Sequence, residues 1–302
     1  PPGGSRLSGV MAKGGPCSEE SVRDAIEQAC LRELEALKPG NVHVYAEGHG
    51  MTVKDFQASA TITAAHLSRR DVPLGEKILI AVESTVAKVG CNTNLGIVLL
   101  CTPLAQAALA ADEEKILLPR LCRVLCALSI DDARFVYKAI RIASPAGLGE
   151  SPEHDVADDP TVDLREAMKA AAERDRIAFQ YAHGFEDVFT IGVPRWREVL
   201  SKGMREEEAA AHVYLGFLSS FPDSHIERKY SAAAAEEVRN RAMKLEITLS
   251  SLSGPEEKKA EMLKFDSDLK ERGLNPGASA DLTVASLLAA KLEDILAHSV
   301  ST

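Results

Sequence analysis

Apolar residues recur at intervals of three and four along most of this 302-residue chain, which is the spacing that lines one face of an α-helix. The first such stretch contains Val22, Ala25, Ile26, Ala29, Cys30, Leu34 and Leu37. The strict alternation of apolar and polar residues that is typical of a half-buried β-strand is scarce. Ala, Leu and Glu, which favour helices, are abundant, whereas aromatic residues make up 5%. The sequence therefore predicts an all-α fold.

Short polar segments divide this pattern into about ten helices. A Pro-Gly stop at residues 38–40 ends the first helix, and Thr52 with Asp55 forms a capping box for the second. Gly90 ends the third helix. Later helices are expected at about 95–111, 113–128, 131–142, 160–182, 195–219, 225–252, 255–272 and 280–298.

No internal repeat or domain boundary interrupts the pattern, so we expect one large helical domain over residues 18–302, preceded by a flexible tail over residues 1–17. The formal net charge of −10 argues against a nucleic-acid partner, because no basic stripe is present to neutralise phosphates. The longest apolar run, 95–111, contains Pro103 and is too short to span a bilayer. We expect a cytoplasmic protein without a membrane partner, and the all-round apolar character of that run is compatible with a homodimer.

The first polar loop runs from Lys38 to Phe56 and contains Gly40, Asn41 and His43. It is rich in Gly and polar residues, and it separates two helices. Loops held between rigid helices are where binding and catalytic groups concentrate. We therefore expect this loop to contribute to a functional site.

The second polar loop, residues 90–96, precedes the all-round apolar segment. Asn94 is expected to cap that helix, whose free N–H groups and positive dipole end suit a phosphate. Asn92 and Thr93 add an amide and a hydroxyl beyond what a cap needs. A plain helix cap without a ligand is the alternative interpretation.

The third polar loop is acidic, since residues 150–163 contain six acidic residues and no Lys or Arg. Asp155, Asp158 and Asp159 offer the oxygen ligands that Mg²⁺ prefers, so we interpret them as a metal site. His154 beside them is a candidate for proton transfer. A solvated acidic loop is the alternative. Asp159 precedes a proline and is expected to cap the next helix.

The fourth polar loop, residues 273–282, contains an Asn-Pro-Gly turn. Ser279 is expected to cap the final helix, with Asp281 in its first turn. Asp223 and Arg228 form a weaker candidate, for which a phosphate contact and a surface cap are equally good interpretations.

The order of these loops resembles the triphosphoribosyl-dephospho-CoA synthase family. Residues 38–40 look like its first motif, and residues 92–96 (Asn-Thr-Asn-Leu-Gly) look like its second, a Val-Asn-Thr-His-Lys-Gly stretch that opens an apolar helix. Residues 275–282 are close to its Ser-Pro-Gly-Gly-Ser-Ala-Asp-Leu motif, and residues 223–224 are similar to its Asp-Ser/Thr-Asn stretch. Together these segments span about residues 33–290.

The resemblance implies an all-helical transferase that acts on a small phosphorylated substrate and uses ATP with Mg²⁺ or another divalent metal. In that family a hydroxyl of dephospho-CoA attacks the ribose C1′ of ATP, and adenine leaves. The implied substrate-binding residues are Lys38, Gly40, Asn41, Asn92, Thr93, Asn94, Asp223, Arg228, Ser279 and Asp281. The implied catalytic residues are Glu35, His43 and His154, and the implied metal ligands are Asp155, Asp158 and Asp159.

Departures from the family pattern favour a second candidate reaction. The second motif has Asn94-Leu95 where the lyase-associated enzymes carry His-Lys, and no Arg-Gly-Gly follows Asp223. The acidic block looks like the branch of archaea and methylotrophic bacteria, where methanofuran and tetrahydromethanopterin are made. The alternative is a diverged member that condenses a furanmethyl diphosphate with a glutamyl-tyramine phenol and releases diphosphate. A non-catalytic helical binding protein is the second alternative, disfavoured because buried polar groups need partners.

Overall fold

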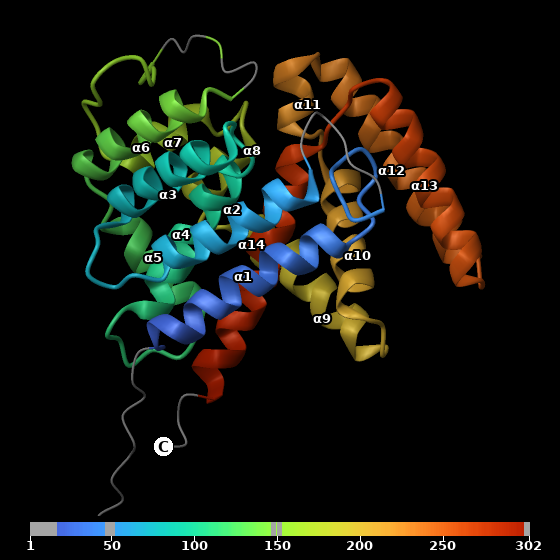
Figure 1. The fold of residues 1–302 in the computed structure, drawn as a ribbon, viewed down its shortest axis with the longest axis horizontal. Helices are drawn as coiled ribbons and strands as arrows, with labels where there is room; N and C mark the ends of the chain where they lie inside the picture. The colour runs from blue at the N-terminus through green and yellow to red at the C-terminus, as the bar shows by residue number, and fades with distance from the viewer. Residues whose placement is uncertain (1–16, 46–51, 146–148, 150–152, 299–302) are drawn as a thin grey trace, which may run out of the picture.

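The computed structural model describes residues 17–45, 52–145, 149 and 153–298, and it confirms the all-α expectation (Figure 1). These residues contain fourteen α-helices and one π-helix, without a strand. The helices before the acidic loop are α1 (Glu19–Glu35), α2 (Val53–Leu67), α3 (Leu74–Val89), α4 (Leu95–Leu109), α5 (Leu117–Cys126) and α6 (Ile130–Ala143). Those after it are α7 (Leu164–Ala171), α8 (Arg176–Ala182), the π-helix η1 (Val188–Gly192), α9 (Val193–Ser201), α10 (Glu206–Ser220), α11 (Ser224–Lys229), α12 (Ala232–Ser251), α13 (Pro255–Glu271) and α14 (Gly277–His298).

The last helix, α14, is central to the fold. It packs against α1, α4, α9 and α10, and Figure 1 shows it running diagonally through the molecule beside α1. Most of its side chains are buried, as expected for a helix surrounded by other helices. The amino-terminal ends of α14 and α4 thereby come to lie in the interior of the molecule rather than at its surface.

Helix α4 is apolar on every side and almost completely buried, as its sequence predicts. It continues through Pro103, although proline removes the hydrogen bond to the carbonyl four residues earlier. The hydroxyl of Tyr181 on α8 donates to that carbonyl, Leu99 O, at 2.6 Å. The partner supplied by α8 explains why a proline is tolerated inside a buried helix.

The helix count exceeds the expected number of about ten mainly because short turns divide three of the expected helices. Residues 172–175 separate α7 from α8, a turn around Gly203 separates α9 from α10, and Tyr230 with Ser231 separates α11 from α12. Gly203 has φ +78°, a left-handed conformation that glycine adopts without strain. Apolar spacing continues across such turns, so the sequence pattern does not reveal them.

The helix starts in part follow and in part correct the expectations. The capping box of Thr52 and Asp55 is present. The helix expected to open at Asp159 instead begins at Leu164, where the Asp163 side chain accepts from the backbone N–H of Glu166. Two regions singled out in the sequence, residues 1–16 and the Gly-rich 46–51, lie outside the described residues. No helix of the described part is long and apolar enough to cross a membrane.

Candidate active site

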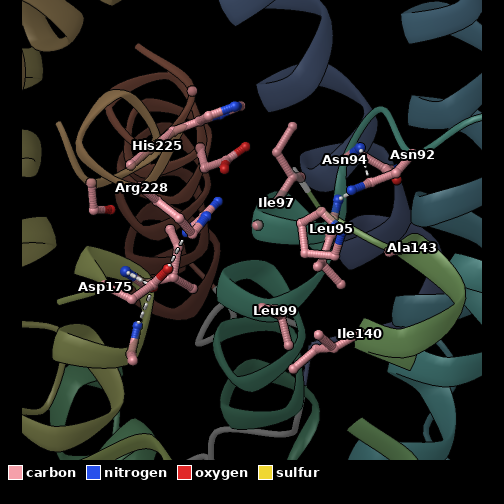
Figure 2. Close-up of a pocket in the computed structure, with 18 of the residues that line it drawn as sticks. Asn92, Asn94, Leu95, Ile97, Leu99, Ile140, Ala143, Asp175, His225 and Arg228 are labelled. Atoms are coloured by element: carbon pink, nitrogen blue, oxygen red, sulfur yellow. Dashed lines mark hydrogen bonds and ion pairs between the residues drawn. The ribbon is translucent and has the colours of Figure 1, made fainter. Parts of the chain in front are cut away.

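A pocket of about 840 Å³ lies where the first turns of α4 and α14 meet. The loop 90–96 and α4 line one side, and the starts of α8 and α11 line the other. Figure 2 shows Asn92 and Asn94 facing Asp175, His225 and Arg228 across it. The structure thus brings together the second and fourth polar loops and the segment around Asp223.

The α4 side of the pocket is built by an amide network. Asn94 is the N-cap residue, but its side chain makes no cap; instead Asn92 Oδ1 accepts from the backbone N–H groups of Asn94 at 3.2 Å and Leu95 at 3.0 Å. Asn94 Nδ2 donates to Thr63 Oγ1 at 2.6 Å, and Thr93 Oγ1 lies 2.6 Å from Ser59 Oγ. Asn94 is thus the N-cap residue, as expected, but Asn92 supplies the capping oxygen, and both asparagines fix the loop at the helix terminus.

The opposite side of the pocket carries the positive charge. Arg228 Nη1 donates to Asp175 Oδ2 at 2.7 Å, while Asp175 Oδ1 caps α8 by accepting from Ile177 N and Ala178 N. Arg228 is part-buried, so its charge is less screened than that of a surface arginine. His225 lies over the start of α14, where a methyl group on Gly277 would come within 2.2 Å of its Nδ1.

Asp281 lies between these two sides, on the second turn of α14. Its carboxylate packs against α4 so closely that a methyl group on Gly96 would come within 2.0 Å of Asp281 Oδ2. Burial raises the pKa of Asp281 well above its ordinary value, and the nearby carboxylates of Glu33, Asp223 and Asp175 raise it further. The glycine of the second motif is thus required by the aspartate of the last.

The remainder of the pocket is largely apolar. Its apolar lining includes Ile97, Leu99, Ile140, Leu164, Met168 and Ile177, from α4, α6, α7 and α8. Arginine is present among the described lining residues, but lysine is not. The pocket therefore offers a polar, partly cationic end and a longer apolar wall, an arrangement typical of small-molecule sites.

Lys38 is not exposed to the pocket. It is 1% exposed, and its ammonium donates to the buried carboxylate of Glu33 and, at 3.0 Å, to Asn41 Oδ1. Asn41, which does line the pocket, also donates to Asn275 Oδ1 at 2.8 Å. Burial lowers the pKa of Lys38 and raises that of Glu33, while their mutual attraction opposes both shifts. In this structure Lys38 holds Asn41, and Asn41 joins the first motif to the last.

Gly40 and His43 anchor the first loop to α13. Gly40 has φ +83°, and its N–H donates to Asp266 Oδ1 at 2.8 Å. His43 is fully buried, and its Nδ1 accepts from the backbone N–H of Tyr45. Its Nε2 lies 3.3 Å from Asp266 Oδ1 and 3.3 Å from Lys270 Nζ. Both ring nitrogens are engaged and neither lines the pocket, so this conformation does not place His43 for proton transfer to a substrate.

The other candidates from the α1 and α14 ends also make protein contacts. Glu35 forms an ion pair with Arg32 at 2.5 Å and does not line the pocket. The expected Ser279 cap is wrong, because α14 begins at Gly277 and Ser279 lies inside it. Ser279 instead donates to the buried Asp223 through both its N–H and its hydroxyl, each at 2.8 Å. Asp223 therefore ties α11 to α14.

The acidic loop is only partly near the pocket. His154 and Asp155 line it, whereas Asp158 and Asp159 are exposed and do not. The carbonyl of His154 accepts from Tyr137 Oη at 2.9 Å, which fixes the loop beside α6. Within the described ranges, no group of three or more His, Cys, Asp or Glu side chains is arranged to hold a metal ion.

Several charged or titratable pocket-lining residues were not expected as site residues from the sequence, among them Glu33, Arg174, Asp175 and His225. The sequence around Glu33 predicts only the polar face of an amphipathic helix. Asp175 lies in a turn that the apolar spacing does not predict, because that spacing continues across it. His225 directly follows the Asp-Ser segment that resembles a family motif, so its position was the available signal.

The chain is similar in sequence and in fold to known proteins of one family. A family model described as ATP:dephospho-CoA triphosphoribosyl transferase matches residues 19–300. A 2-(5''-triphosphoribosyl)-3'-dephosphocoenzyme-A synthase from Pectobacterium atrosepticum is 28% identical over 229 residues, which cover 74% of this chain and 66% of that relative. The matched part thus spans just under two thirds of the relative's length. A candidate triphosphoribosyl-dephospho-CoA synthase from Archaeoglobus fulgidus has a similar fold, with a TM-score of 0.59 and 23% identity over 80% of this chain and 98% of that one.

Proposed function

Because this chain belongs to the ATP:dephospho-CoA triphosphoribosyl transferase family, we propose that its pocket binds ATP together with a hydroxyl-bearing acceptor of the dephospho-CoA class. The hydroxyl oxygen forms a bond to the ribose C1′, the bond from C1′ to adenine breaks, and adenine leaves. The observation that carries this proposal is the meeting of two helix amino termini and Arg228 in one part-buried pocket.

The triphosphate is proposed to lie between the start of α4 and Arg228. Backbone N–H groups at a helix amino terminus and the positive end of its dipole attract phosphates. Arginine adds charge-assisted hydrogen bonds, each stronger than a neutral one. Asn92 fixes the conformation of the α4 terminus by accepting a hydrogen bond from the backbone N–H of Leu95. Asp175 holds Arg228 toward the pocket through the 2.7 Å ion pair. The apolar wall around Ile140 and Met168 is left for the less polar parts of the two substrates.

Mg²⁺ enters this proposal as the partner of the triphosphate. Mg²⁺ is usually held by substrate phosphates with one or two carboxylates, so a preformed cage of three protein ligands is not required. Asp155 is the acidic-loop aspartate that lines the pocket and is the one we propose to meet the ion. The bound ion would neutralise phosphate charge.

The experiment is to incubate the purified protein with ATP, Mg²⁺ and dephospho-CoA and to separate the products by chromatography with mass detection. The proposal predicts free adenine and an equal amount of dephospho-CoA enlarged by one triphosphoribosyl group. ATP that is consumed without adenine, or not consumed at all, would contradict it. Omitting dephospho-CoA gives the control for simple ATP hydrolysis.

A second candidate is favoured by the apolar wall and by Leu95 at a position where the lyase-associated enzymes carry lysine. In it, the phenol oxygen of a glutamyl-tyramine attacks the methylene carbon of a furanmethyl diphosphate, and diphosphate leaves. A furan and a phenol suit an apolar wall better than a second nucleotide does. Release of diphosphate from these substrates, with no adenine from ATP and dephospho-CoA, would favour this candidate over the first.

A further inference from the structure

Three carboxylates near Asp281 are compensated by partners within the protein. Glu33 is paired with Lys38 and Asp175 with Arg228. Asp223 accepts from Ser279 and from two backbone N–H groups of α11. For Asp281, no hydrogen-bond or ion-pair partner occurs in the part of the chain that the structure describes. Among the carboxyl groups at the junction of α4 and α14, Asp281 is therefore the uncompensated one; Glu227, which also lines the pocket, is exposed to solvent.

The surroundings of Asp281 favour its protonated form. An isolated carboxylate removed from water is costly, and neighbouring negative charges add to the cost. The titratable groups that face it are Glu33 and Cys30 from α1, Lys38 after α1, Cys101 from α4, Asp175 before α8 and Asp223 before α11. Burial and the three nearby carboxylates raise its pKa, and Lys38 only partly opposes this. A triphosphate bound beside it would favour the protonated form further.

From this geometry we infer that Asp281 is the catalytic acid that protonates the leaving group. The inference rests on the proposed function, in which that group is adenine. Asp281 lies at the contact between α4 and α14, where it adjoins the proposed triphosphate seat. The residue is half-buried and lines the pocket. A purine leaves a ribose far more readily when a ring nitrogen is protonated, because the departing electron pair is then neutralised.

The proton and electron balance of this step is complete without a further reactant. As the bond from C1′ to adenine N9 breaks, its electron pair goes to the base, and the Asp281 proton passes to a ring nitrogen. The acceptor oxygen bonds to C1′ and loses its proton to water, and Asp281 then regains a proton from water. The products are neutral adenine and the triphosphoribosylated acceptor.

The test compares Asp281→Asn with the wild type on two nucleotides, ATP and ATP methylated at N7. Asparagine keeps the size of the side chain but has no proton to give. With ATP, we expect kcat to fall by about 100-fold or more, within the range known for general acids, with little change in KM. The N7-methylated base is already cationic and leaves without a proton, so Asp281→Asn should leave its kcat within about threefold of the wild-type value.

A matched control is Asp294→Asn, the same substitution at an exposed position of α14. Equal losses on both nucleotides would mean that Asp281 acts only through structure, and retained activity on ATP would remove it from the step; either result overturns the inference. The wild-type kcat with ATP should also fall as pH rises through the pKa of Asp281. The pH–rate profile of the Asn variant should lack this decrease. Adenine release by the wild type would support the proposed function whether or not Asp281 is the acid.

Discussion

Asp281 on α14 and Gly96 on α4 are in direct contact, so close that a methyl group on Gly96 would come within 2.0 Å of Asp281 Oδ2. The contact joins the second and fourth polar loops of the sequence. The Asp281 carboxyl group thus lies at the amino terminus of α4. Arg228 lies across the pocket from that terminus (Figure 2).

Gly96→Ala should therefore disable the site. The added methyl group must displace the Asp281 side chain or separate α4 from α14, so we expect at least a tenfold loss of kcat and a lower melting temperature. Gly254→Ala is the matched control, because there the nearest atom is the flexible Glu257 side chain at 3.1 Å. Wild-type turnover by Gly96→Ala would show that this contact is unimportant.

Arg228→Gln should weaken nucleotide binding more than it slows chemistry. Loss of a charge-assisted phosphate contact costs about 1.5–3 kcal/mol, which corresponds to roughly a 10- to 150-fold rise in the Kd for ATP. Isothermal titration with ATP measures this change directly. Arg272→Gln removes the same charge away from the pocket, at the C-cap of α13 where Arg272 pairs with Glu237, and should leave the Kd unchanged. An unchanged Kd for Arg228→Gln would place the triphosphate elsewhere.

The buried pair of Lys38 and Glu33 should behave as a structural unit. Lys38→Met leaves a buried carboxylate uncompensated, which typically costs about 3–5 kcal/mol of unfolding free energy. Replacing both residues, with Glu33→Leu added, should recover most of that loss because no buried charge remains. Urea unfolding of the two variants gives the comparison. If Lys38→Met were as stable as the wild type and only ATP binding suffered, the sequence-based role in phosphate binding would be restored.

His43 should make the protein less stable in mild acid. Burial lowers its pKa below the ordinary value, so the folded protein binds fewer protons than the unfolded chain, and stability falls as pH drops below about 6.5. His43→Gln should flatten that slope by at most one proton, which is about 1.4 kcal/mol per pH unit. Unfolding free energies between pH 7.5 and 5, roughly bracketing this range, measure it. The exposed His298→Gln serves as control, and an unchanged slope for His43→Gln would contradict the assignment.

The fold class and the family were predictable from the sequence. Apolar spacing of three and four reports helices directly, and the loops carried enough of the motif pattern for the family resemblance that the match over residues 19–300 confirms. The turn that divides α7 from α8 was missed because the apolar stripe continues across it. The start of α14 was missed because Ser279 looks like a cap but bonds to Asp223, a partner far away in sequence.

The composition of the pocket was only partly predictable, because tertiary partners decide where polar loop residues point. Loop position indicated Asn92, Asn94 and Asp281, which line the pocket. Lys38 is held away from the pocket by Glu33 on the preceding helix. His43 is held by Asp266 on α13. Polar residues in a loop can serve a ligand or another helix, and only the tertiary packing decides which.

A crystal structure of the protein with ATP and Mg²⁺, grown without an acceptor, would show whether this pocket is the nucleotide site. We expect phosphates between the amino terminus of α4 and the guanidinium of Arg228, with adenine within hydrogen-bond distance of the Asp281 carboxyl group. A nucleotide bound elsewhere, with this pocket empty, would contradict the assignment of the active site.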